Sequence, residues 1–114
     1  MLQDIEAARR RNEKSLRAAL ERLLAYFRQL GAERVVLFGS LASGKVNEWS
    51  DIDLLVVMPS DRPGKEWRRT ISGEVERPVA LDLLVFTSSE LDENLPASSL
   101  LREIMANGVV LYEK

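Results

Sequence analysis

The sequence contains no cysteine and no histidine among its 114 residues. Without Cys, disulfide bonds, thiolate metal sites and Cys nucleophiles are excluded. Without His, imidazole metal ligands, Ser-His-Asp hydrolysis and His general bases are excluded as well. Any chemistry must therefore use carboxylates, hydroxyls, amines, the backbone and bound metal ions.

Long hydrophobic runs are also missing. The longest uncharged apolar run is residues 54–58, far short of the ~20 residues that span a bilayer. Residues 1–6 lack the apolar stretch of a signal peptide. We therefore expect a cytoplasmic protein that does not associate with membranes.

Neither sign of charge is in large excess. Lys and Arg total 16 and Asp and Glu total 18, a net charge of −2. Sequence-blind nucleic-acid binding needs excess positive charge, so the chain is a poor candidate for it. A content of 46% hydrophobic and 30% charged residues is that of a globular protein. The length predicts one domain over residues 1–114.

The N-terminal region, residues 1–30, is predicted to be a helix. Its second half has an apolar stripe at helical spacing, formed by Leu16, Leu20, Leu23, Leu24, Phe27 and Leu30. Gly31 follows at the expected end. Basic residues interrupt the stripe in the first half, at Arg9, Arg10, Arg11 and Lys14. That half is either a solvated helix face or a partner-binding extension.

The remaining pattern alternates strands with helices. We predict strands at 35–38, 52–58 and 79–86, a helical turn at 40–43 ended by Gly44, helices at 65–76 and near 100–105, and a short last strand at 109–112. A single turn between the first two strands suits an antiparallel or mixed sheet. The longer helical crossover to the third strand favours a right-handed parallel connection. The fold class is α+β (mixed α/β).

Two carboxylates stand at the start of the second strand, in Asp51-Ile52-Asp53. Alternate strand residues share a face, so Asp51 and Asp53 point the same way with Cα atoms roughly 6.5–7 Å apart. The same face continues into apolar residues, where two like charges resist desolvation. A divalent cation removes both problems, and Mg²⁺ prefers carboxylate and phosphate oxygens.

Asp82 lies in a strand that is otherwise apolar on both faces. A lone buried carboxylate costs several kcal/mol unless it is paired. If its strand neighbours the second strand, Asp82 reaches the same metals, and three carboxylates then predict a two-metal site.

Gly39 and Ser40 join the first strand to a helical turn. Glycine lets the backbone approach a phosphate closely, and Ser40 could cap the turn and offer its hydroxyl to phosphate. Gly44 and Lys45 could close the loop around a triphosphate. A Walker loop is excluded because its Gly-Lys-Ser/Thr ending is missing. Each feature alone has an ordinary structural explanation, but all three occur in order within one small chain.

The spacing of Gly39-Ser40, ten residues and Asp51-Ile52-Asp53 resembles the signature of the polymerase-beta-like nucleotidyltransferase superfamily. Residues 36–44 and 49–57 resemble its small prokaryotic members, the minimal nucleotidyltransferases. Asp82 falls where these have a third Asp, and residues 104–112 resemble their last helix and strand. The resemblance covers about residues 30–112.

This resemblance implies a small mixed sheet with helices packed on one side. It implies transfer of a nucleoside monophosphate from an NTP to an acceptor hydroxyl, with AMP from ATP as the expected group. Asp51 and Asp53 would bind Mg²⁺ or Mn²⁺ with the triphosphate, and Asp82 would bind the second ion and help deprotonate the acceptor. Gly39, Ser40 and Lys45 would bind the nucleotide.

Two positions depart from the family pattern. Leu41 and Ser43 stand where many relatives have Arg, which removes two counter-charges for phosphate. Lys45 would have to compensate for this loss. Larger relatives also add a helical domain that completes the base and acceptor sites, which this sequence lacks.

Minimal nucleotidyltransferases are commonly paired with a HEPN-family helical protein, as antitoxin and toxin, and adenylylate a Tyr on that partner. The resemblance therefore implies such a partner in a hetero-oligomer. One alternative is transfer to a small hydroxylated molecule such as an antibiotic, with a homodimer or partner completing the site. Another is a module that sequesters a partner without catalysis.

Overall fold

The computed structural model describes residues 2–75 and 80–114. Its elements, in chain order, are α1 (Leu2–Leu30), β1 (Arg34–Phe38), α2 (Gly39–Ser43), β2 (Ile52–Met58), α3 (Gly64–Glu74), β3 (Leu81–Thr87), α4 (Ser88–Asn94), the 3-10 turn η1 (Leu95–Ala97), α5 (Ser99–Asn107) and β4 (Val109–Glu113). The predicted start of the third strand at Val79 lies outside the described residues. No described helix is long and apolar enough to cross a membrane.

The strands form one mixed sheet in the order β3-β2-β1-β4. β1 pairs antiparallel with β2 and β4, whereas β2 pairs parallel with β3. Both predicted pairings are therefore confirmed: the single turn of α2 reverses the chain, and the α3 crossover keeps its direction. The α+β class is confirmed as well.

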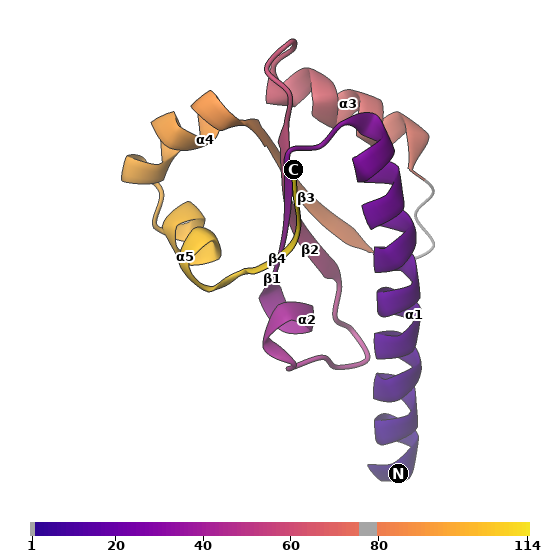
Figure 1. Ribbon diagram of the computed structural model, residues 1–114. Helices are drawn as coiled ribbons and strands as arrows, with labels where there is room; N and C mark the ends of the chain where they lie inside the picture. The colour runs from indigo at the N-terminus through magenta and orange to yellow at the C-terminus, as the bar shows by residue number, and fades with distance from the viewer. Residues whose placement is uncertain (1, 76–79) are drawn as a thin grey trace.

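Helices cover both faces of this sheet, with α1 and α3 on one side and α4 and α5 on the other (Figure 1). Val35 and Leu54 pack into the core under α1 and α3, while Val36 and Leu55 pack into the core under α4 and α5. The expectation that helices pack on one side only is wrong. Helices cover both sides because β1 and β2 are apolar on both faces, so each face needs a covering layer.

Helix α4 was not anticipated from the sequence, although its start has a recognisable signal. Thr87 is its N-cap and accepts a hydrogen bond from the Glu90 backbone N–H at 3.3 Å, while the Thr87 N–H donates to the Glu90 carboxylate at 2.8 Å. This is a capping box, readable as Thr-x-x-Glu. It begins the layer that covers the second face.

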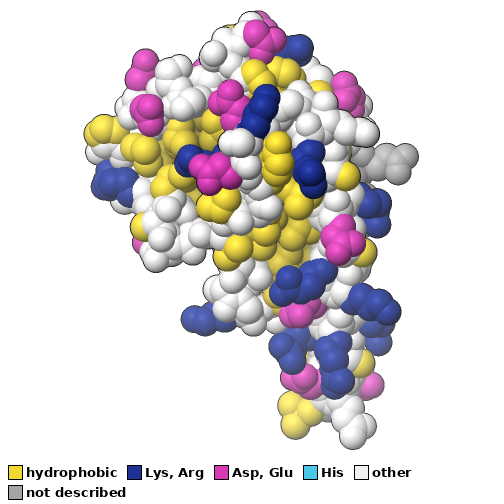
Figure 2. Space-filling model, viewed as in Figure 1, with side chains coloured by type: hydrophobic (Ala, Val, Ile, Leu, Met, Phe, Trp, Pro, Cys, Tyr) yellow, Lys and Arg dark blue, Asp and Glu magenta, His cyan; other side chains and the backbone are white. Residues whose placement is uncertain are grey.

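The first half of α1 extends beyond the sheet and past α2 (Figure 1). Its first buried residue is Leu16, and Leu2 and Ile5 are exposed. Lys and Arg side chains gather on this projecting end (Figure 2). The helix thus runs unbroken from Leu2 to Leu30, but only its second half packs on the sheet.

Candidate active site

The carboxylates meet at one end of the sheet. In the parallel register of β2 and β3, Asp53 pairs directly with Asp82. Leu55 and Val57, two and four residues beyond Asp53, lie in the core under α4 and α5, so Asp53 and Asp82 are on this face. Asp51 immediately precedes β2. The predicted adjacency of the two strands is confirmed, and we call this end the carboxylate edge.

Asp53 is the most enclosed of the three carboxylates. It is half-buried, whereas Asp51 and Asp82 are exposed. Burial, followed by the nearby charges of Asp82 and Asp51, raises the pKa of the Asp53 carboxyl above its ordinary value. The expectation that Asp82 is a costly buried carboxylate is wrong, because it is the second residue of β3 and lies at the open end of the sheet.

The carboxylate edge offers only oxygen donors, which suit Mg²⁺ or Mn²⁺. Asp82 lies beside Asp53 in the register of the sheet, and Asp51 lies two residues before it. Within residues 2–75 and 80–114, no three Asp, Glu, Cys or His side chains are arranged to hold a metal ion. The donor chemistry fits, and the predicted two-metal site stays a prediction.

Gly39 lies against the carboxylate edge and turns the chain from β1 into α2. Its φ of +76° is in the left-handed region, and a Cβ at this position would collide with the Asp53 carboxylate. A larger residue therefore could not occupy the site without displacing Asp53. The backbone at the start of α2 therefore lies close to the carboxylate edge, and its predicted approach to a phosphate stays a prediction.

Ser40 does not cap this turn as expected. Phe38 holds the N-cap position without a side-chain hydrogen bond, and Ser40 is the second residue of α2. The Ser40 carbonyl accepts hydrogen bonds from the Gly44 and Lys45 N–H groups and from Ser43 Oγ. Its role is to close the turn through the backbone.

The positions that depart from the family pattern have different structural roles. Leu41 is 2% exposed and packs in the core under α1 and α3, so its side chain points away from any bound phosphate. Ser43 is exposed and bonds to the backbone of α2. Lys45 is exposed and forms no ion pair with a described residue.

A hollow of about 340 Å³ lies between α2 and α5, next to Gly39. Its lining is mostly apolar and consists of Phe38, Gly39, Ala42, Ser43, Leu100, Glu103, Ile104, Asn107 and Gly108. Asn107 Nδ2 donates a hydrogen bond to the Glu103 carboxylate at 2.8 Å. This hollow could not be predicted from the sequence, because its two walls are some 60 residues apart in the chain.

A model of the nucleotidyltransferase domain matches residues 20–111, which is most of the chain and includes the carboxylate edge. The chain belongs to the nucleotidyltransferase domain family. The matched residues do not include the projecting end of α1. No curated protein matches the chain.

A solved structure supports the same fold. The crystal structure at 1.40 Å of a protein from Sulfolobus solfataricus, itself only provisionally assigned as a nucleotidyltransferase, superposes with a TM-score of 0.55. The two are 21% identical, and the alignment covers 95% of this nucleotidyltransferase chain and 86% of the other. At this identity the likeness shows the fold alone.

Proposed function

We propose that this nucleotidyltransferase transfers a nucleoside monophosphate, most simply AMP, from an NTP to an acceptor hydroxyl. The observation that best supports this is the pairing of Asp53 with Asp82 in register, with the Gly39 backbone directly against Asp53. Carboxylates beside a close-approaching backbone suit a metal-bound triphosphate.

The three carboxylates would have different roles in metal binding. Asp51 and Asp53 would hold the metal that binds the triphosphate, and Asp82 would hold the metal beside the acceptor. Bound Mg²⁺ or Mn²⁺ would supply Lewis-acid stabilisation of charge on the phosphates. Gly39, Ser40 and Lys45 would bind and orient the β- and γ-phosphates.

The transfer is a substitution at the α-phosphorus. The acceptor oxygen forms a bond to this phosphorus, and the bond to the oxygen bridging the α- and β-phosphates breaks. The electron pair leaves with pyrophosphate, and the Asp82 carboxylate accepts the hydroxyl proton. Positioning provides most of the rate in such reactions, so the absence of His is no obstacle.

The acceptor in this proposal is a Tyr of a HEPN-type helical partner, which makes the nucleotidyltransferase the antitoxin of a pair. The family resemblance supports it, because a partner that carries the acceptor Tyr would itself form part of the acceptor site. Transfer to a small hydroxylated compound and non-catalytic sequestering are the competing functions.

The test incubates α-labelled ATP and Mg²⁺ with this protein and a HEPN-type helical protein. Label should move to a partner Tyr with the wild type and with Asp92→Ala, an exposed control on α4. It should not move with Asp82→Ala, although ATP still binds. Label on small hydroxylated compounds without the partner would favour the small-molecule enzyme. Tight binding of the two proteins without any labelling would favour sequestering.

A further inference from the structure

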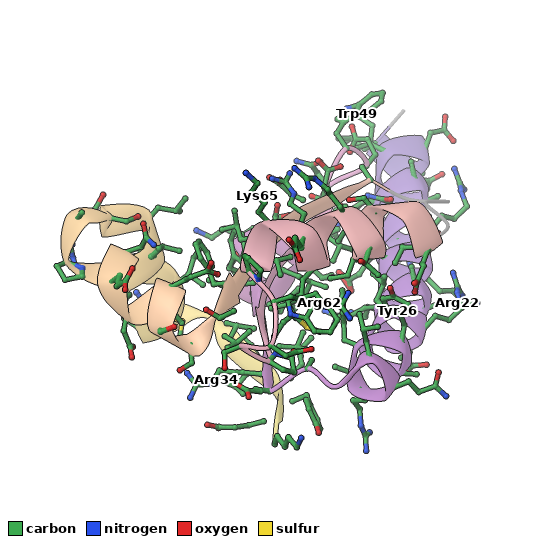
Figure 3. All side chains as sticks on the ribbon, turned by 90° about the horizontal axis from the view of Figure 1, so that it is seen from above. Arg22, Tyr26, Arg34, Trp49, Arg62 and Lys65 are labelled. Atoms are coloured by element: carbon green, nitrogen blue, oxygen red, sulfur yellow. The ribbon has the colours of Figure 1, made fainter. Side chains whose placement is uncertain are left out.

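The chain has two tryptophans in opposite environments. Trp67 is 4% exposed, its indole N–H donates to the Pro59 carbonyl at 2.8 Å, and the Arg62 guanidinium lies 3.9 Å from the centre of its ring. Trp49 is 82% exposed, and its side chain points away from the body of the molecule (Figure 3). An exposed indole keeps a large apolar surface in water.

Trp49 belongs to the loop of residues 44–51, which is held firmly at its backbone. Asn12 of α1 donates hydrogen bonds to the carbonyls of Asn47 and Ser50 at 2.8 and 3.2 Å. The Trp49 N–H donates to Asn47 Oδ1 at 2.8 Å, and Val46 anchors the loop in the core. These contacts hold the backbone of the loop in place, and the Trp49 indole stays exposed on it.

The loop leads directly into the carboxylate edge. Trp49 is two residues from Asp51, so their Cα atoms are at most about 7 Å apart. The base of an NTP is joined to its phosphates through a single ribose, so an NTP held there by its phosphates can place its base beside this loop. A base offers a flat face, and an exposed aromatic ring is a stacking partner for such a face.

We infer that Trp49 is the stacking platform for the nucleobase of the NTP. The inference rests on the proposed function, and it gives the nucleotidyltransferase a wall for the base that the sequence alone did not reveal. Because stacking strengthens with ring area, it favours purine over pyrimidine nucleotides and does not separate adenine from guanine.

Calorimetric titration with MgATP, MgCTP and Mg-tripolyphosphate tests this. Trp49→Ala should weaken ATP binding about 5- to 100-fold, weaken CTP binding less, and leave tripolyphosphate binding unchanged. Trp49→Phe should keep most of the ATP affinity. Val110→Ala, which trims an equally exposed apolar residue on β4 (52% exposed), should change none of these. ATP should also quench the fluorescence of the wild type and not that of Trp49→Phe.

Unchanged ATP binding in Trp49→Ala would overturn the inference and leave the proposed function intact. Equal loss of ATP and tripolyphosphate binding would also overturn it, because Trp49 would then support the loop structurally. Slower label transfer at unchanged ATP affinity would assign Trp49 to the acceptor instead. A wild type that binds neither ligand would contradict the proposed function itself, together with the inference.

Discussion

Asp53 is the residue at which folding and the proposed chemistry conflict. It is half-buried, lies against Gly39, and pairs with Asp82. Burial and the two neighbouring carboxylates raise its pKa, so its ionised form is disfavoured in the folded protein. A carboxylate in these surroundings is better suited to binding a cation than to a purely structural role.

Removing the charge of Asp53 should therefore not destabilise the metal-free protein. Because the pKa of Asp53 is raised, folding favours its protonated form. The contribution of this protonation to the free energy of unfolding is fully present below the unfolded pKa of about 3.9. It is lost as pH rises through the raised folded pKa. Asp53→Asn should match or exceed the wild type at neutral pH, and its advantage should disappear on acidification. Urea unfolding in chelator at several pH values measures this, with Asp92→Asn as control. A loss of about 2 kcal/mol or more would instead indicate a structural hydrogen bond.

Two glycines provide a matched pair of backbone tests. Gly39→Ala adds a methyl group at a positive φ and against the Asp53 carboxylate, so it should cost at least ~1 kcal/mol and lower ATP affinity. Gly73 lies in α3, and a Cβ there meets nothing within 4 Å. Gly73→Ala should stabilise by up to ~1 kcal/mol and leave ATP binding unchanged. Wild-type stability and ATP affinity in Gly39→Ala would contradict the described geometry.

At the scale of elements, α1 combines two different environments on one helical stripe. Ile5 and Leu16 occupy the same side of the helix, since eleven residues are close to three turns. Leu16 is 1% exposed and Ile5 is 49% exposed. The stripe continues past the sheet, where no described residue buries it.

Alanine substitutions at these two positions should have different effects on stability, because only the second half of α1 is packed on the sheet. Leu16→Ala should lower the free energy of unfolding by about 2–5 kcal/mol, whereas Ile5→Ala should change it by less than about 0.5 kcal/mol. Denaturant unfolding measures both changes. An equal cost at Ile5 would show that the projecting end is covered in solution, which favours the partner-binding interpretation over a solvated face.

The predictable elements were those specified by local patterns. β1, β2 and the ends of α1 and α5 follow from apolar runs, helical spacing and glycine stops. Asp53 and Asp82 could be brought together because a helical crossover favours parallel neighbours. Features that depend on distant contacts could not be predicted: the exposure of Asp82, the hollow between α2 and α5, and the bonds from Asn12 to the backbone of the loop that carries Trp49. Helix α4 was missed despite its Thr87–Glu90 signal.

At the scale of the whole molecule, the sheet gathers the candidate chemistry at one end. Gly39 follows β1, Asp51 precedes β2, Asp53 lies in β2 and Asp82 lies in β3, and these three strands are neighbours in the sheet. The residues that match the nucleotidyltransferase domain include this arrangement. With the projecting half of α1, the molecule measures 50 × 30 × 21 Å. Asn12 in this half binds the backbone of the loop that leads to the carboxylate edge.

Thermal unfolding with Mg²⁺ and ATP, separately and together, tests whether the carboxylate edge binds a metal ion and a triphosphate. If the carboxylate edge binds metal and triphosphate as one unit, the two together should raise Tm by more than the sum of their separate effects, because ligand that binds only the folded state stabilises it. Asp51→Asn combined with Asp53→Asn should abolish this increase, while Asp92→Asn combined with Glu93→Gln, which removes equal charge from exposed positions on α4, should keep it. If Asp51→Asn combined with Asp53→Asn responds as strongly as the wild type, the nucleotide site must lie elsewhere.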